Sequence, residues 1–318
     1  MNTPAEFSPQ INTLLNGVSP LPHLGVIQAQ GEDAANFLHN QLSNDVLLLP
    51  VGQSRLAAFC SAKGRMQASF VVIKTAPDTV LLVMSLDLLA QTLKRLSMFV
   101  LRAKVKMSDA TGQWQLRGLL GDSARATVGA ATPWQTTVKE GAHAVSLYPA
   151  VLGESPIPRA LWIAPAGHTL HPGADVPSDF WSWAEVMSGV PLVTQPLFEA
   201  FVPQMLNYES VGGVNFKKGC YPGQEVVARS QFRGTLKRRT ALVHSPVALA
   251  TGQDVFTPTD PEQPCATVVL CAARPDGQGF HALVSGTLES QQSGWLVGSA
   301  QGEALELLPL PYALLADI

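Results

Sequence analysis

The sequence has few charged residues and no long hydrophobic run. Asp, Glu, Lys and Arg together make up 14% of its 318 residues, and the net charge is −3. Apolar residues make up 46%, but no stretch of them reaches the roughly 20 residues that a transmembrane helix needs. Residues 1–22 have little positive charge and no apolar core of the signal-peptide type, so we expect no export. We therefore predict a globular, cytoplasmic protein without membrane association.

Cysteine is also scarce. Cys60, Cys220, Cys265 and Cys271 form no CxxC pair and no His-containing pattern of zinc-ligand spacing. We therefore expect no metal site, and reduced thiols as in other cytoplasmic proteins. None of the seven histidines lies in a motif that would pair with a catalytic cysteine, which disfavours a cysteine hydrolase. The sequence has no internal repeats and no low-complexity tract.

The first 110 residues show periodicities that predict alternating strands and helices. A helix is expected over 31–42, ending before Ser43-Asn44-Asp45, and a second over Leu86–Met98, where Asp87 is interpreted as a capping carboxylate. Gly64 suits the backbone of a hairpin turn, and Cys60, next to that turn, is interpreted as structural. Strands are expected over 24–30, 54–61, 65–75, 80–84 and 100–107.

A second α+β unit is expected over residues 113–175, and the remainder is rich in β-strand patterns. Trp181 and Trp183 lie on a helix that begins at Ser178-Asp179 and ends before Gly189. Because they are two residues apart, one is expected to pack inward and the other to line a cavity or the surface. Asp276-Gly277 predicts a hairpin. Strands are expected over 114–120, 144–148, 160–164, 237–247, 265–273, 280–285 and 304–308.

The segment Lys217–Arg229 has the most unusual composition, Lys-Lys-Gly-Cys-Tyr-Pro-Gly-Gln-Glu-Val-Val-Ala-Arg. Pro222-Gly223 predicts a tight turn just after Cys220. Lys217, Lys218 and Arg229 would favour the thiolate of Cys220 if they converge on it. The alternative is an ordinary loop in which Cys220 is a small buried apolar residue. Loops flanked by Pro and Gly often have functional residues, so Cys220 is a candidate reactive thiol.

The same region is basic. Seven Lys and Arg residues lie between positions 217 and 239, against one acid, Glu225. One interpretation is a solvated face. The other is a place for anionic groups, such as a phosphate or RNA. The segment is too short to indicate nucleic acid by itself, and we expect no direct nucleic-acid binding. The basic residues are at positions 217, 218, 229, 233, 237, 238 and 239.

Residues 218–225, Lys-Gly-Cys-Tyr-Pro-Gly-Gln-Glu, resemble the signature K-G-C-Y-x-G-Q-E of the YgfZ family of folate-binding proteins. That family is related to the aminomethyltransferase (T-protein) of the glycine cleavage system. The resemblance implies an α+β T-protein-like fold, with two ferredoxin-like units around a cavity, followed by a small C-terminal β-barrel. It implies a folate-binding region over 1–237, with two interleaved units that meet near residue 110, and a barrel over 238–318. Further matches are Pro203-Gln204, Asn207, Gly212-Gly213-Val214, Arg233-Gly234 and Lys237-Arg238.

The resemblance also implies a function. It predicts binding of tetrahydrofolate or a one-carbon derivative, and support for the assembly or repair of iron–sulfur proteins and, through them, tRNA modification. The expected partners are folate and, transiently, iron–sulfur proteins or their assembly factors, and a monomer is expected. The protein is expected to be an accessory factor more than a classical enzyme; any enzymatic activity would be of the one-carbon transferase kind. The expected site residues are Cys220 as the reactive thiol with Lys218 and Arg229, the loop residues Gly219, Tyr221, Gly223, Gln224 and Glu225, and the folate-binding residues Trp181, Asn44 and Lys63.

One position departs from the related pattern. Met187 stands where T-proteins and many relatives have a glutamate that binds the pterin. Two other functions stay open: a folate-dependent aminomethyltransferase or demethylase, and a non-catalytic scaffold that binds RNA or an acidic partner through residues 217–239. The K-G-C-Y-x-G-Q-E loop favours the accessory factor over the transferase.

Overall fold

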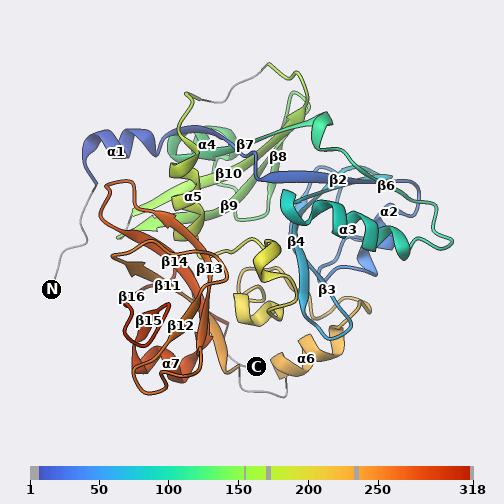
Figure 1. The fold of residues 1–318 in the computed structure, drawn as a ribbon. Helices are drawn as coiled ribbons and strands as arrows, with labels where there is room; N and C mark the ends of the chain where they lie inside the picture. Colours follow the sequence, from blue (N-terminus) through green and yellow to red (C-terminus); the bar gives the residue numbers. More distant parts are fainter. Residues whose placement is uncertain (1–6, 154, 170–172, 233–235, 316–318) are drawn as a thin grey trace.

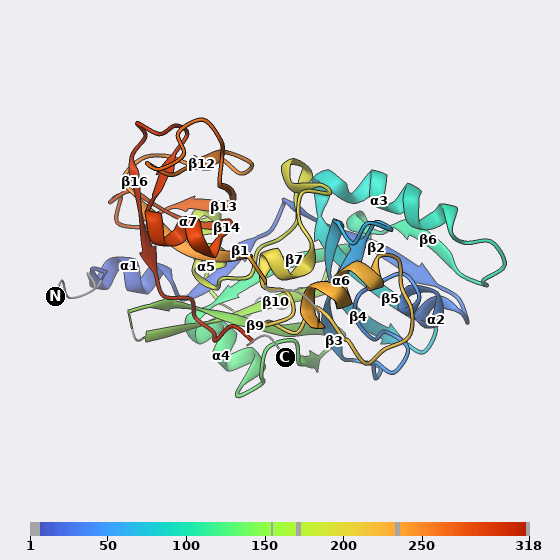
Figure 2. The same cartoon turned by 90° about the horizontal axis from the view of Figure 1, so that it is seen from below.

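The computed structural model describes residues 7–153, 155–169, 173–232 and 236–315. They form two five-stranded antiparallel sheets and a closed six-stranded barrel. The first sheet and the barrel lie on opposite sides of a central, largely irregular segment, which is yellow in Figure 1 and is seen from below in Figure 2. This arrangement confirms the predicted α+β fold with a C-terminal β-barrel.

The first sheet has the strand order β3-β4-β5-β2-β6. Its strands are β2 (Leu24–Gln30), β3 (Ser54–Cys60), β4 (Met66–Ala76), β5 (Thr79–Ser85) and β6 (Lys106–Asp109). Helices α2 (Ala34–His39) and α3 (Leu86–Met98) pack against it. Helix α3 buries Leu88, Leu89 and Leu96, three of the four leucines that its periodicity places on one face, together with Thr92, whereas the fourth leucine, Leu93, is only partly buried.

Two predictions in this sheet were wrong in detail. Strand β6 begins only at Lys106, opposite Gln30, and not at residue 100. The preceding residues form a loop in which the Lys104 amide donates to Asp33 Oδ2 (2.8 Å), so this amide does not take part in a strand ladder. Asp87 is not a helix cap: its carboxylate accepts hydrogen bonds from Ser85 Oγ (2.6 Å) and from the Gln195 amide (2.8 Å). Asp87 therefore joins α3 to the central segment.

The second sheet has the strand order β1-β7-β10-β9-β8. Its first strand precedes the whole of the first sheet in the chain, so the two units interleave. Helices α1 (Pro9–Leu14), α4 (Gly121–Val128) and α5 (Ser178–Met187) belong to this half of the molecule, with the short 3₁₀ turn η1 (Thr111–Gln113) before β7. The strands are β1 (Gly17–Pro20), β7 (Trp114–Leu120), β8 (Thr136–Lys139), β9 (Ala142–Leu152) and β10 (Ser155–Pro165).

The C-terminal strands close into the barrel in the order β11-β14-β13-β12-β15-β16. Gly277, with φ +72°, forms the predicted hairpin turn between β13 and β14. Helix α7 (Leu288–Ser293) lies between β14 and β15. The central segment contributes the 3₁₀ turns η2 (Gln195–Leu197) and η3 (Pro203–Leu206) and helix α6 (Gln224–Phe232). The barrel strands are β11 (Arg238–Ser245), β12 (Asp254–Phe256), β13 (Ala266–Ala273), β14 (Phe280–Thr287), β15 (Trp295–Val297) and β16 (Ala304–Leu308).

Helix α5 packs against both β9 of the second sheet and β13 of the barrel. Consequently both of its tryptophans are buried, Trp181 being 2% exposed and Trp183 fully enclosed, and the prediction that one of them faces a cavity or solvent was wrong. Trp183 Nε1 donates to His281 Nδ1 across to the barrel (2.9 Å). Among the described helices, none is long and apolar enough to cross a bilayer.

Candidate functional site

The first part of the Lys217–Arg229 segment, residues 217–223, forms a partly exposed loop, and the rest is the beginning of helix α6. The thiol of Cys220 is exposed. The Gln224 amide donates to Tyr221 O (3.2 Å), and Gly223 has φ +79°, which confirms the turn predicted after Cys220. Helix α6 begins at Gln224, and Glu225 lies in its first turn, where a carboxylate interacts favourably with the helix dipole.

The turn makes close backbone contact with the β3–β4 hairpin. A Cβ atom at Gly223 would lie 2.4 Å from Ser61 O and 2.7 Å from Gly64 Cα. Gly64 has φ +72°, and its own added Cβ would lie 2.9 Å from Val226 Cβ. The two glycines therefore allow the hairpin and the loop to meet. Lys63, at the tip of the hairpin, is exposed.

Lys218 is buried, and its side chain is bonded to backbone carbonyls of another element. Its side chain is 8% exposed, and its ammonium group donates to His39 O and Leu42 O just past the end of α2, the second at 2.8 Å. A cation at this end of a helix satisfies free carbonyls and offsets the helix dipole. The ammonium also lies 4.7 Å from the ring centroid of buried Tyr221. Burial lowers the pKa of Lys218 to about 8, against the opposite influence of Asp45 and Cys220.

A histidine and a carboxylate lie beside the same loop. His39 Nδ1 is 3.1 Å from Asp45 Oδ1, and both side chains are largely buried. Burial alone would raise the pKa of Asp45, but hydrogen bonds from the Leu48 amide and from His39 lower it on balance. The other ring nitrogen of His39, Nε2, would be 3.6 Å from a Cβ at Gly219, the residue before Cys220. An imidazole oriented by a carboxylate is an arrangement that can accept a proton from a nearby thiol.

Among the described cations of the basic segment, Lys218 interacts electrostatically with Cys220, and the others lie in different surroundings. Arg229 is exposed on α6, and its side chain makes no hydrogen bond or ion pair with any other described residue. Arg239 is buried in an ion pair with Glu209, and Arg238 donates to Ser285 O (3.2 Å). Residues 233–235, including Arg233, lie outside the described part of the chain. Some of the described cations of the segment are therefore buried and others exposed, and together they do not form one continuous basic face.

An open groove adjoins the loop. It has a volume of about 360 Å³ and combines the aromatic rings of Trp134 and Phe216 with the cations Arg55 and Lys217. Asn44 holds one wall, because its amide donates to Leu56 O (2.8 Å) and Gly212 O (2.7 Å). Lys217, the first residue of the loop that contains Cys220, is therefore also a lining residue of the groove.

A smaller cavity of about 70 Å³ lies deeper, between the two sheets and the central segment. Trp134 lines both this cavity and the groove, and its φ of +71° is unusual for a bulky residue. Glu185 and Arg159 are the charged side chains among the described lining residues. Arg159 is 4% exposed and its Nε has no hydrogen-bond partner among the described residues. Burial lowers the pKa of Arg159 to about 10.

The three predicted folate-binding residues do not line the same one of the cavities that described residues form. Asn44 lines the groove, Lys63 is at the hairpin tip, and Trp181 is in the core. The Arg159 guanidinium lies 4.4 Å above the Trp181 ring, so a ligand in the inner cavity would meet Arg159 before Trp181. Met187 is buried, and the carboxylate that α5 supplies to the cavity is Glu185.

Sequence reasoning missed His39, Trp134, Arg159 and Glu185. Glu185 could have been found, since it is a carboxylate in the middle of a largely apolar helix, away from the capping position of Asp179. The other three belong to segments without a distinctive motif. Burial raises the pKa of Cys60 to about 12, in accord with its structural interpretation. Among the described residues, no three His, Cys, Asp or Glu side chains are placed to hold a metal ion.

Comparisons with known proteins agree with this architecture. A family model described as the GCVT N-terminal domain matches residues 16–149. An uncharacterised protein of Haemophilus influenzae is 26% identical over 293 residues, covering 91% of this chain and 95% of that protein. The crystal structure of the glycine cleavage system aminomethyltransferase T from Bartonella henselae matches with a TM-score of 0.64 and 14% identity, covering 96% of this chain and 89% of that one. This last likeness confirms the T-protein-like fold.

Proposed function

We propose that this protein binds tetrahydrofolate or a one-carbon derivative of it and supports the assembly or repair of iron–sulfur proteins, and through them tRNA modification. Cys220 is the reactive thiol. The observation that supports this most directly is that Lys217, at the start of the loop that presents the exposed Cys220, lines the groove. The T-protein-like fold and the K-G-C-Y-x-G-Q-E loop add to it.

The groove and inner cavity fit the chemistry of a folate. The groove volume of about 360 Å³ is within the usual range for small-molecule sites. Trp134 and Phe216 offer faces for a flat ring system, and Arg55 and Lys217 offer charge for glutamyl carboxylates. Deeper in the molecule, Glu185 can accept hydrogen bonds from pterin N–H groups, and Arg159 has an unused donor. When bound, the folate supplies a one-carbon unit next to the protein.

The inner cavity of about 70 Å³ is too small for a ring system as it stands. Trp134 separates it from the groove, and the Trp134 indole N–H donates to Val211 O (2.7 Å). On this proposal the Trp134 ring would have to move for the inner cavity to hold a pterin, and the strained backbone at that residue is where such a movement would occur.

On this proposal the Cys220 thiol is activated by residues that lie next to its loop. Asp45 orients His39, and His39 Nε2, which faces residue 219, accepts the proton of the Cys220 thiol to give a thiolate. The thiolate is presented at the surface, where it can contact a client protein. Lys218, whose ammonium is bonded to α2, holds the loop in place.

The test is calorimetric titration of the protein with tetrahydrofolate and with its formyl and methylene forms. We expect saturable binding by the wild type and about tenfold weaker binding by Glu185→Gln, which loses a charge-assisted hydrogen bond. Glu262→Gln, an exposed carboxylate in the barrel, is the matched control. Trp134→Phe is a better probe than Trp181→Ala, because truncating a buried tryptophan costs about 3–5 kcal/mol of stability.

The client role needs a separate readout. Cells that lack this protein would be complemented with wild type, Glu185→Gln or Cys220→Ser, and the activity of an iron–sulfur enzyme measured. Full activity with Cys220→Ser would reject the thiol. Absence of binding to every folate would reject the ligand, and the interaction scaffold would then be the better explanation.

A further inference from the structure

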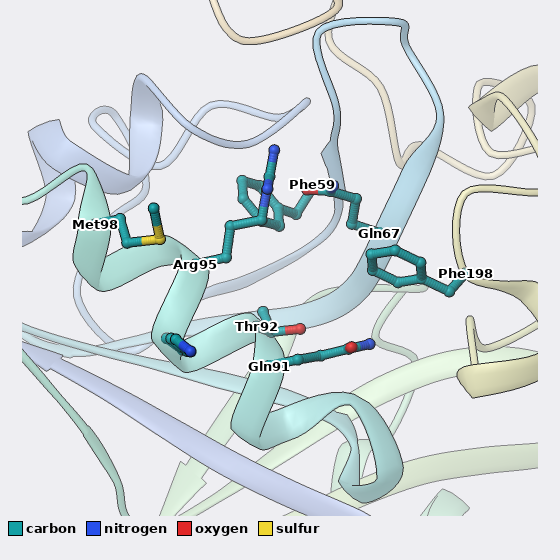
Figure 3. A pocket seen from close by; sticks show the side chains of 8 residues that line it. Phe59, Gln67, Gln91, Thr92, Arg95, Met98 and Phe198 are labelled. Atoms are coloured by element: carbon teal, nitrogen blue, oxygen red, sulfur yellow. The ribbon is translucent and has the colours of Figure 1, made fainter.

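A third cavity lies away from the groove and the inner cavity, between helix α3, the β3–β4 pair and the central segment (Figure 3). Its volume is about 230 Å³. It has no lining residue in common with the other two cavities. In Figure 3 the side chains of Gln91 and Thr92 extend from α3 toward the ring of Phe198, which points in from the opposite side.

Thr92 is the first sign that this cavity is built for a ligand. Its side chain is 2% exposed and lies on the buried face of α3, between Leu88 and Leu96. A helical hydroxyl usually donates to the carbonyl four residues earlier, as Ser97 does to Leu93 O (2.7 Å) in the same helix. Thr92 Oγ1 is buried and has no partner among the described residues, and Thr92 is one of the residues that line the cavity. Such a group costs free energy unless something else satisfies it.

Gln67 is the second sign. It is also 2% exposed, and its Nε2 donates to Glu199 Oε1 (2.6 Å). This leaves Gln67 Oε1 buried without a donor among the described residues. Glu199 itself has φ +56°, a strained conformation for a residue with a side chain. Two residues that line one cavity from different elements thus each have a buried polar atom without a partner among the described residues.

The remaining walls define the complementary molecule. Phe59 and Phe198 provide apolar surface, and Met98, which is 67% exposed, covers the rim. Lys94 and Arg95 are exposed at the same rim and form no ion pair within the described residues. A volume of about 230 Å³ is below the usual range for drug-sized ligands, so a molecule with one ring system fits and a whole folate does not.

We propose that this cavity binds a small organic anion with a flat apolar body and an N–H donor. The anionic group pairs with Arg95 and Lys94, the ring lies against Phe59 and Phe198, and the N–H group donates to Gln67 Oε1. Thr92 Oγ1 bonds to the same ligand. This site is independent of the proposed folate site.

The probe is indole-3-carboxylate, which has all three features. Two analogues lack one each: 1-benzothiophene-3-carboxylate lacks the N–H group, and indole lacks the acid. Ligand-observed NMR should give a dissociation constant on the order of 1 mM for the first probe, as expected for a fragment of this size, and at least about fivefold weaker binding for both analogues. Tetrahydrofolate should not displace it.

Substitutions of the lining residues test whether the probe binds in this cavity. Arg95→Gln and Thr92→Val should each weaken binding of indole-3-carboxylate about fivefold, while Lys139→Gln, an exposed cation on β8, should leave it unchanged. Thr92→Val should also raise the urea midpoint of the ligand-free protein, because a methyl group replaces an unsatisfied buried hydroxyl. This second readout shows that the variant folds.

Three results would overturn the proposal. Equal binding of all three probes would indicate simple apolar adhesion. Binding that neither Arg95→Gln nor Thr92→Val affects would place the probe elsewhere. No binding at about 10 mM, ten times the expected constant, together with a lower urea midpoint for Thr92→Val, would mean that water satisfies these polar atoms.

Discussion

The contact between Gly223 and the β3–β4 hairpin predicts a large effect of adding one methyl group. Gly223 has φ +79°, and its added Cβ would lie 2.4 Å from Ser61 O and 2.7 Å from the Gly64 nitrogen. These are backbone atoms, which cannot rotate away as a side chain can. Gly223→Ala should therefore separate the loop from the hairpin and displace Cys220.

The magnitude follows from comparison with Gly277, which has φ +72° but no atom within 4 Å of an added Cβ. The left-handed backbone costs an L-residue about 1–2 kcal/mol, and the stiffer unfolded chain returns about 0.4–1 kcal/mol. Gly277→Ala should therefore destabilise the protein by about 1 kcal/mol. Gly223→Ala adds an overpacking cost of about 1–3 kcal/mol, for a total of about 2–4 kcal/mol.

Urea unfolding of both variants measures the difference, provided that the m-value is unchanged. The rate of Cys220 alkylation by iodoacetamide, followed by peptide mass spectrometry, reports the loop itself. It should change in Gly223→Ala and stay constant in Gly277→Ala. Equal free energies of unfolding for the two variants would refute the argument, because the close contact would then cost nothing.

Three further variants test the surroundings of the loop and the link to the barrel. Lys218→Met removes a group whose pKa burial lowers to about 8. Between about pH 8 and 10 the unfolded wild type binds a proton that the folded wild type does not, so the free energy of unfolding of the wild type should rise with pH relative to that of the variant. A difference in free energy of unfolding, measured in urea, that stays constant over this pH range would contradict the argument. Glu209→Gln breaks the buried ion pair with Arg239 and should cost about 3 kcal/mol, whereas Asp122→Asn, in an exposed pair, should cost less than about 1 kcal/mol; similar losses in the two would argue against burial as the cause. His39→Ala should slow alkylation of Cys220 at neutral pH several-fold, with exposed Asn40→Ala as the control, and an unchanged rate would exclude His39 as the base.

Features with a local physical cause could be predicted from the sequence. The helix Leu86–Met98 has the predicted bounds because its apolar spacing is regular. The turns at Gly64 and Gly223 follow from the need for positive φ. Features set by packing between distant segments could not be predicted. Asp87 looks like a cap in sequence because nothing nearby shows that the Gln195 amide will lie beside it.

The site residues illustrate the same division. The loop around Cys220 is visible in sequence because its special residues are consecutive. His39 and Asp45 reach that loop only through the fold, since they belong to α2 and to the turn after it. Trp181 was misplaced for a related reason. Two helical residues that are two positions apart do face different directions. However, α5 is covered by the second sheet on one side and by the barrel on the other, so both directions lead into the protein interior.

The structure also explains why the loop needs so many special residues in order to present one thiol. Lys218 is bonded to the carbonyls after α2, Tyr221 is buried, and Gly223 touches the hairpin backbone. Each of these three residues holds the loop against another element, whereas Cys220, which lies between them in sequence, is exposed. A thiol on a flexible loop would need none of these anchors. The anchors fix the position of Cys220 relative to α2 and the β3–β4 hairpin, so substitutions at Lys218 or Gly223 should alter its reactivity without touching the sulfur.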